Sequence, residues 1–408
     1  DGSYLISGTK IFITAGEQDL TENILHLVLA RAPDAPAGIK GISLFLVPKF
    51  IPNEDSSLGE RNNVVCGSIE HKMGLKASAT CTMNFENATG WLVGNLNEGM
   101  RAMFKMMNVE RLSVGMQGLG IADGSYQNAV EYAKERLQGN SPRATAPSQG
   151  PEPITVHPDV RRMLLTMRSL VEGSRAFGIR TSQWLDYSNK LADAGQRKHY
   201  DNLVQLLTPV IKAFFTDMAS EVTNIGVQVL GGSGFIRESG MEQLVRDARI
   251  TQIYEGTNGV QAMDLVGRKL PSNNGETCAI YFGLINDYIA EKQDQEDIKE
   301  FIQPLAAAIA RLQEATDYIA TKRVEDPAEI GSAAVDYLQL FGLTALAFEW
   351  AQMAEVSLAN KADDAEFYGA KVQTAQFFMQ RILPRTLSYH AAVLSGAGSI
   401  MDFDDNAW

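Results

Sequence analysis

The feature that most constrains the fold is a change in the spacing of apolar residues near Glu98. Before it, short runs such as YLISGTKIFITAG, ILHLVLARA and GISLFLVP are rich in Ile, Leu, Val, Phe and Thr, and Gly, Pro, Asp and Asn separate them. Such runs predict β-strands joined by turns. After it, apolar residues follow helical spacing. The sequence therefore predicts an α+β chain that begins with a small β sandwich or barrel domain over residues 1–95.

The helical part is interrupted at two places. The stretch GNSPRATAPSQGPEP follows a long helical pattern and predicts a mobile surface loop. Helical spacing resumes with Pro158 and Asp159, which suit a first turn. It continues over about 201–229 and 241–248 and once more beyond Glu255. The cluster PSNNG then predicts a boundary, so we expect a helical bundle domain over 96–271 and an additional C-terminal helical domain over 272–408.

Composition excludes several classes of function. The 36 Lys and Arg residues face 49 Asp and Glu residues, a net charge of -13, which argues against broad nucleic-acid binding because phosphate calls for basic patches. Cys66, Cys81 and Cys278 are far apart and the histidines lack metal-ligand spacing, so neither a disulfide framework nor a metal site is predicted. The cysteine pattern favours a reducing cytoplasm, and because the sequence shows no signal peptide and no apolar run of ~18 residues, we expect no transmembrane segment.

The stretch QIYEGTNGVQ, residues 252–261, contains the candidate catalytic group, Glu255. One interpretation is a helix cap, in which the carboxylate accepts hydrogen bonds from backbone N–H groups at the start of a helix. Thr257 or Asn258 would fill that position better than Glu255.

The other interpretation is a general base. Burial of the Glu255 carboxylate by Ile253 and Tyr254 would raise its pKa, which would bring it nearer to the operating pH. Gly256 would let a ligand approach the backbone closely. The residues alone leave both interpretations open.

A second candidate site is the glycine cluster in VQVLGGSGF, residues 227–235. Gly231, Gly232 and Gly234 could let backbone N–H groups approach a phosphate, with Gln228 as an uncharged partner for a pyrophosphate. The alternative is an ordinary turn after a helix. No βαβ unit surrounds the cluster, which argues against a Rossmann site.

A series of motifs in a fixed order resembles the acyl-CoA dehydrogenase family over residues 1 to about 270. The motifs are IFITAG, KMGLKASAT, VERLSVGMQGLG, ERLQG, VQVLGGSGF and VRDARITQIYEGTNGVQ. The insertions RNNVVCGSIEHKMG and ERLQGNSP, with the additional helical tail, resemble the large branch of that family. The resemblance implies a flavoprotein of fatty acid metabolism that uses FAD to convert an acyl-CoA to the trans-2-enoyl-CoA. It also implies a homodimer or tetramer that passes electrons to an electron-transferring flavoprotein.

The resemblance also implies roles for individual residues. Glu255 would remove the α proton and the flavin N5 would take the β hydrogen as hydride. The backbone N–H of Glu255 and a flavin ribityl hydroxyl would hold the thioester carbonyl, and Arg111 and Gly256 would lie at the substrate. The implied contacts to FAD are Phe12, Ile13 and Thr14 at the flavin ring, Thr257 and Asn258 beside the base, and Arg136, Gln228, Gly231 and Gly232 at the adenosine and pyrophosphate from a neighbouring subunit.

The sequence departs from the family pattern in three ways. The motif ending in RLQG lacks the usual aromatic contact to adenine. Glu110 stands where the long-chain and isovaleryl branch of the family has its base, so it is either an alternative base or an ordinary helix residue paired with Arg111. The family's N-terminal helical domain is not in this chain, so we expect a chain that starts at Asp1 to bind FAD weakly or not at all and to be inactive. The other functions considered are acyl-CoA oxidase-type chemistry and a non-catalytic interaction module.

Overall fold

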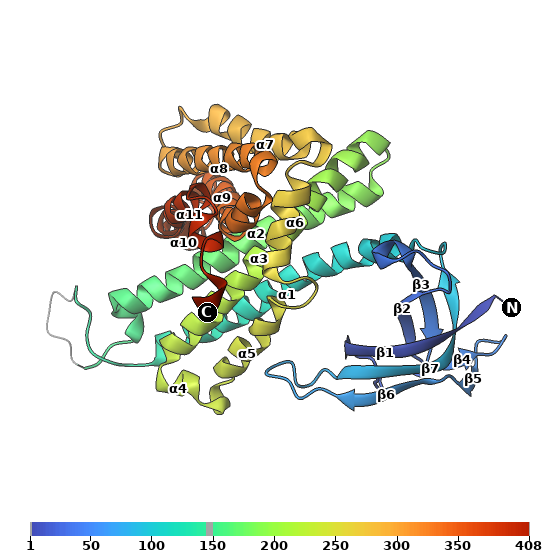
Figure 1. Ribbon diagram of the computed structural model, residues 1–408. Helices are drawn as coiled ribbons and strands as arrows, with labels where there is room; N and C mark the ends of the chain where they lie inside the picture. Colours follow the sequence, from blue (N-terminus) through green and yellow to red (C-terminus); the bar gives the residue numbers. More distant parts are fainter. Residues whose placement is uncertain (1, 144–149, 408) are drawn as a thin grey trace. The chain divides into compact units, whose positions relative to one another are not determined.

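The structure is a computed structural model that describes residues 2–143 and 150–407. The chain divides into two compact units, Asp1–Glu110 and Arg111–Trp408. The first unit contains all the strands labelled in Figure 1, and the second contains most of the helices. Part of the predicted mobile loop, residues 144–149, lies outside the described residues. The described ends of that loop are paired, because the backbone N–H of Gln138 donates to the carbonyl of Glu152 (2.9 Å).

The first unit is a curled antiparallel sheet, as the strand pattern predicted. Its strands are β1 (Ser3–Thr14), β2 (Leu25–Arg31), β3 (Ile42–Pro48), β6 (Val64–Ile69) and β7 (Thr80–Val93), and β4 (Phe50–Pro52) pairs with β5 (Leu58–Arg61) beside it. The long strand β7 pairs with β1 along most of its length, with β6 through its first half and with β3 at its end. Val28, Phe45, Val47, Met83 and Phe85 form the core of this unit.

The predicted helices of the bundle are present with bounds close to those expected. They are α1 (Gly99–Glu135), α2 (Pro158–Lys190), α3 (Ala194–Leu230), the short α4 (Gly232–Phe235), α5 (Met241–Thr251) and α6 (Asn258–Asp264). Pro158 opens α2 with Asp159 in its first turn, as predicted. The side chain of Asp193 caps α3 by accepting a hydrogen bond from the backbone N–H of Gln196 (2.7 Å).

The remaining helices follow a sharp break in the chain. Asn273, Asn274 and Gly275 all have left-handed backbone conformations, which end the preceding helical segment. The helices beyond the break are α7 (Glu276–Lys292), α8 (Lys299–Glu325), α9 (Pro327–Ala359), α10 (Ala365–Phe377), α11 (Arg385–Leu394) and α12 (Gly398–Met401). They pack with the bundle helices into one compact unit.

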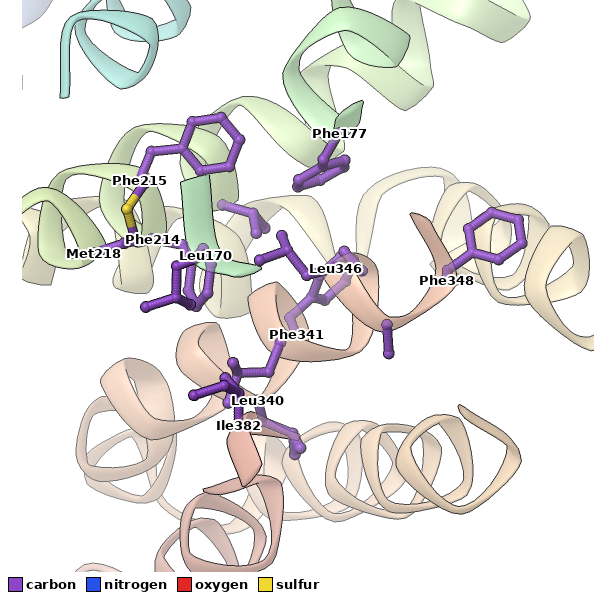
Figure 2. Packing of buried hydrophobic residues seen from close by; sticks show 14 of the residues in the cluster. Leu170, Phe177, Phe214, Phe215, Met218, Leu340, Phe341, Leu346, Phe348 and Ile382 are labelled. Carbon is purple, nitrogen blue, oxygen red and sulfur yellow. The ribbon is translucent and has the colours of Figure 1, made fainter. Parts of the chain in front are cut away.

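The centre of the second unit is α9, which is apolar on nearly all sides. By length and composition α9 could cross a membrane, but 67% of its most apolar window is buried, which is the pattern of a core helix. Figure 2 shows buried side chains from α2, α3, α9 and the helical segment Phe378–Ile382; the labelled residues are Leu170, Phe177, Phe214, Phe215, Met218, Leu340, Phe341, Leu346, Phe348 and Ile382. The C-terminal helices therefore share one hydrophobic core with the bundle.

Candidate active site

The candidate base lies in a tight turn between α5 and α6. The backbone N–H of Asn258 donates to the carbonyl of Gln252 (3.1 Å), which closes the turn across seven residues with Glu255 at its middle. Glu255 (φ 55°) and Gly256 (φ 91°) both have positive φ angles. The helix cap is Thr257, whose hydroxyl accepts from the backbone N–H of Val260 (3.4 Å). The cap position is thus filled, and the cap interpretation of Glu255 is wrong.

The left-handed conformation of Glu255 is supported from α1. A non-glycine residue in this region carries a strain of about 1–2 kcal/mol. Arg111 is buried, with 6% of its surface exposed, and its Nε donates to the carbonyl of Glu255 (3.3 Å). Its charge is balanced by buried Asp264 (3.6 Å), which also accepts from Arg268 (2.6 Å). The Tyr254 hydroxyl is hydrogen-bonded to Gln117.

Glu255 presents two groups without partners. Within residues 2–143 and 150–407, no hydrogen bond or ion pair engages the half-buried carboxylate of Glu255. The same holds for its backbone N–H. A proton acceptor and a hydrogen-bond donor therefore stand on the same residue of the turn.

Two expectations for the surroundings of Glu255 are wrong. Ile253 is 46% exposed and therefore does not provide the apolar shield that was expected of it, because its position in the turn directs it outward. Glu110 is exposed, and the ion pair of Arg111 is made with Asp264 instead of Glu110. Adjacent residues of a helix point in different directions, so Glu110 does not face Arg111.

A buried lysine lies under the turn. Lys212 of α3 is fully buried, and its Nζ donates to the side-chain oxygen of Asn258 (2.9 Å). Loss of hydration lowers the pKa of Lys212 to about 8; the carboxylates of Asp217 and Glu255 act in the opposite direction. Sequence analysis missed Lys212, although a lysine within the apolar run PVIKAFF was a visible signal.

Asn258 uses its side-chain amide within the protein. The amide nitrogen donates to Asp217 (2.7 Å), Thr216 (2.9 Å) and the carbonyl of Ala213 (3.1 Å), and the amide oxygen accepts from Lys212. These bonds anchor the end of the turn on α3.

Gly256 is tightly enclosed on one side. A Cβ at this position would lie 2.4 Å from the Nε2 of Gln261, a fully buried side chain without hydrogen-bond partners among the described residues. Gly259, three residues on, has open space around it and an ordinary helical φ angle.

We therefore expect opposite effects of alanine at these two glycines. Gly256→Ala should lower the free energy of unfolding by about 1–3 kcal/mol, because alanine resists the positive φ angle and overlaps with Gln261. Gly259→Ala should leave it unchanged or raise it by up to about 1 kcal/mol. Urea denaturation of both variants checks this, and equal effects would show that the turn tolerates a side chain at Gly256.

The residues expected at the adenosine and pyrophosphate gather at the other end of α3. Gly231 ends α3 with a positive φ of 60° and Gly232 follows it, so the predicted turn after a helix is present. A Cβ at either glycine would meet nothing within 4 Å, and Gln228 is exposed beside them. Arg136 follows the end of α1 and is exposed.

This glycine turn is separate from the Glu255 turn. Tyr132, one turn before Arg136, places its hydroxyl 3.5 Å from the Ser233 hydroxyl, so the end of α1 lies beside the glycine turn. Gln228 lies sixteen residues beyond Lys212 on α3, which is roughly 24 Å along the helix axis. The two groups of residues therefore lie apart on the second unit.

The residues expected at the flavin ring lie near the end of β1. The pairing of β1 with β7 shifts between Lys10 and Ile13, which marks a β-bulge. Phe12 lies within it, with a positive φ of 59° and 68% of its surface exposed. Ile13 is half-buried and Thr14 is exposed. The ring of Phe12 is therefore held on a strained backbone conformation and is open to contact at the surface.

Comparison with known proteins identifies the family. The family model for the acyl-CoA dehydrogenase C-terminal domain matches residues 97–270, and the model described as acetyl-CoA dehydrogenase C-terminal like matches residues 281–404. The chain is 44% identical to 3-methylmercaptopropionyl-CoA dehydrogenase of Ruegeria pomeroyi, with 98% of this chain and 68% of that protein covered. It is 35% identical to the broad-specificity linear acyl-CoA dehydrogenase FadE5 of Mycobacterium tuberculosis, with 100% of this chain and 70% of that protein covered.

A solved structure shares the fold. An acyl-CoA dehydrogenase from Bacillus anthracis, complexed with FAD, superimposes with a TM-score of 0.76 at 20% identity, covering 96% of this chain and 64% of that chain. The chain thus spans about two thirds of the length of the proteins that it matches. Together, the family models and the identity to curated relatives over nearly all of this chain show that it belongs to the acyl-CoA dehydrogenase family of FAD-dependent oxidoreductases.

Proposed function

We propose that this protein dehydrogenates an acyl-CoA thioester to the trans-2-enoyl-CoA, with Glu255 as the base that removes the α proton. The observation that carries the proposal is the state of Glu255 in its turn: the carboxylate and the backbone N–H both lack partners within the described part of the chain. A carboxylate that is hydrogen-bonded to nothing else is available to accept a proton.

The backbone N–H of Glu255 gives the base a second role. An α proton of a thioester is too weakly acidic for a carboxylate to remove unaided. A donor on the thioester oxygen stabilises the negative charge that develops there, and a single donor of this kind contributes about 3–4 kcal/mol. The left-handed turn supports this arrangement, because Glu255 carries both the base and the donor.

Gly256 and Arg111 support the Glu255 turn, and Arg111, which was expected at the substrate, is buried and bonded within the protein instead. Glycine at 256 allows the positive φ of 91° that the backbone adopts directly after Glu255. Arg111, buried and bonded to the Glu255 carbonyl, would hold the turn in the conformation that directs its N–H outward.

The residues present also fit FAD. When bound, FAD supplies an acceptor for the β hydrogen as hydride at its N5 atom. Phe12 offers an exposed ring for the flavin, together with Ile13 and Thr14. The open glycine turn suits the adenosine and pyrophosphate, with the side chains of Gln228 and Arg136 beside it. Thr257 and Asn258 would lie against the flavin beside the base, where the amide and the backbone N–H of Asn258 are both already bonded within the protein.

Several further properties follow from family membership as proposals. They are an electron-transferring flavoprotein as electron acceptor and a homodimer or tetramer; the cytoplasmic location is proposed from the cysteine pattern instead. The matches of the two family models, over 97–270 and 281–404, support division of the helical part into a bundle domain (96–271) and an additional domain (272–408).

Titration of the full-length, FAD-loaded protein with acyl-CoA esters under anaerobic conditions tests the proposed function. Straight-chain and branched esters of increasing length should be compared. We expect at least one ester to remove the absorbance of oxidised flavin stoichiometrically, and the most effective ester to define the substrate class. The matching 2-enoyl-CoA should bind without this loss. Retention of oxidised flavin with every ester would contradict the proposal.

A further inference from the structure

Asp217 of α3 joins three separate segments of the chain. Its Oδ1 accepts hydrogen bonds from the side chains of Gln252 (2.6 Å) and Asn258 (2.7 Å), and its Oδ2 accepts one from Gln339 of α9 (2.7 Å). Gln252 and Asn258 each lie three residues from Glu255, on opposite sides of it. The Asp217 carboxylate therefore holds both ends of the turn that carries Glu255.

These contacts are strong enough to fix the turn. Hydrogen bonds to an ionised carboxylate are shorter and about twice as strong as those between neutral groups. Asp217 is half-buried, so its attraction for these donors is weakened less by water than at an exposed site. The backbone bond between Asn258 and Gln252 closes the same turn (3.1 Å), so its two ends have little freedom to separate.

The third bond determines how Asp217 itself is oriented. Within the described residues, Gln339 is the hydrogen-bond partner of Oδ2, and no other is found there. Loss of this donor would leave Oδ2 to attract Gln252 or Asn258 away from Oδ1. Gln339 lies on α9, in the C-terminal helices beyond the break at 273–275.

We propose that Asp217 is a positioning residue for Glu255, and that Gln339 brings the C-terminal helices into the support of the active-site turn. This inference rests on the proposed role of Glu255 as base. It assigns a chemical purpose to the helices of residues 272–408, which the sequence left without one.

A neighbouring contact provides a matched control. One helical turn beyond Asp217, Glu221 accepts two hydrogen bonds from Arg385 of α11 (2.8 and 2.9 Å). This pair also joins the C-terminal helices to α3, and it lines the same cavity of about 290 Å³ as Asp217 and Gln339. It makes no hydrogen bond to the Gln252–Asn258 turn among the described residues.

The test compares variants of the full-length, FAD-loaded protein. The measurements are the rate constant of anaerobic flavin reduction at saturating acyl-CoA, the concentration of ester that gives half of that rate, and Tm. Gln339→Met keeps the side-chain length without the donor and should lower the rate constant on the order of 10-fold, because small displacements of a reacting group lower rates steeply. Asp217→Asn should lower it by about 10²-fold. The half-saturating concentration should change little in both.

Two further variants separate positioning from stability. Arg385→Met should lower Tm and leave the rate constant unchanged. Gln339→Lys restores a donor in a cavity lined by the carboxylates of Asp217, Glu221 and Asp336, and should recover most of the rate lost in Gln339→Met. Two results would overturn the positioning role. One is a rate constant that falls in proportion to Tm in all variants. The other is a rate constant that is unchanged in Gln339→Met and Asp217→Asn although Glu255→Gln abolishes flavin reduction. An unchanged rate in Glu255→Gln overturns the proposed base itself.

Discussion

Glu255→Gln should lower the rate of anaerobic flavin reduction by acyl-CoA by up to about 10⁴-fold, since proton transfer by a positioned base contributes up to that factor. Glutamine keeps the length of the side chain and the backbone N–H, so the turn should remain closed between Gln252 and Asn258. What is lost is the proton acceptor alone. The affinity for the ester and for FAD should therefore change little, and the loss should appear in the rate constant at saturating ester.

Glu110→Gln is the matched control for this experiment. It makes the same chemical change at the other carboxylate that the family pattern offers as a base. Glu110 is exposed and makes no ion pair with Arg111, so we expect a rate close to that of the unaltered protein. The opposite result, with loss only in Glu110→Gln, would move the base to α1 and leave Glu255 with a structural role.

Arg180→Met should lower the free energy of unfolding at pH 8 by up to about 3–5 kcal/mol, the range found when one member of a buried ion pair is removed, because Glu349 is buried while Arg180 is partly exposed. Arg180 of α2 donates to both oxygens of Glu349 on α9 (2.6 and 2.9 Å), and only 3% of Glu349 is exposed. Methionine fills similar space but leaves the Glu349 carboxylate buried without its partner.

The loss of unfolding free energy in Arg180→Met, called the deficit below, should depend on pH. Burial raises the pKa of Glu349, while the hydrogen bonds and charge of Arg180 lower it, so the pKa should rise further in the variant. A carboxyl group with a raised pKa in the folded state destabilises the protein as pH rises through that pKa. The deficit should therefore be smaller at pH 5 than at pH 8.

Urea denaturation of both proteins at the two pH values measures this deficit. The control is Arg162→Met on the same helix, because Arg162 pairs with Asp159 (2.8 Å) where both side chains are more than half exposed. Its effect should stay below about 1 kcal/mol at either pH. An equally small effect of Arg180→Met would mean that water reaches Glu349 in the folded protein.

The parts that the sequence predicted well depend on neighbours in the chain. The change to helical spacing near Glu98, the start of α2 at Pro158 and the fitness of Thr257 as a cap are all decided within a few residues. Local chemistry suffices for such features, because capping and turn geometry involve adjacent backbone groups.

The parts that it did not predict depend on residues far apart in the chain. The pairing of Arg111 with Asp264 and the bonds of Asp217 to Gln252 and Gln339 join segments that no local pattern connects. The exposure of Ile253 likewise follows from the course of the turn and not from its apolar character. The hydrogen-bond partners of Asp217 and Lys212 lie on other segments, so they become evident only after the helices have packed.

The packing of α9 also restricts how this chain can associate with copies of itself. The apolar side chains of α2 and α3 that meet α9, among them Leu170, Phe214 and Met218, are already covered by helices of the same polypeptide. A surface enclosed within one subunit is closed to a second one. Any symmetric assembly must consequently use other faces of the molecule. A chain shortened before α9 would expose these apolar side chains of α2 and α3 to solvent, and such a surface favours aggregation.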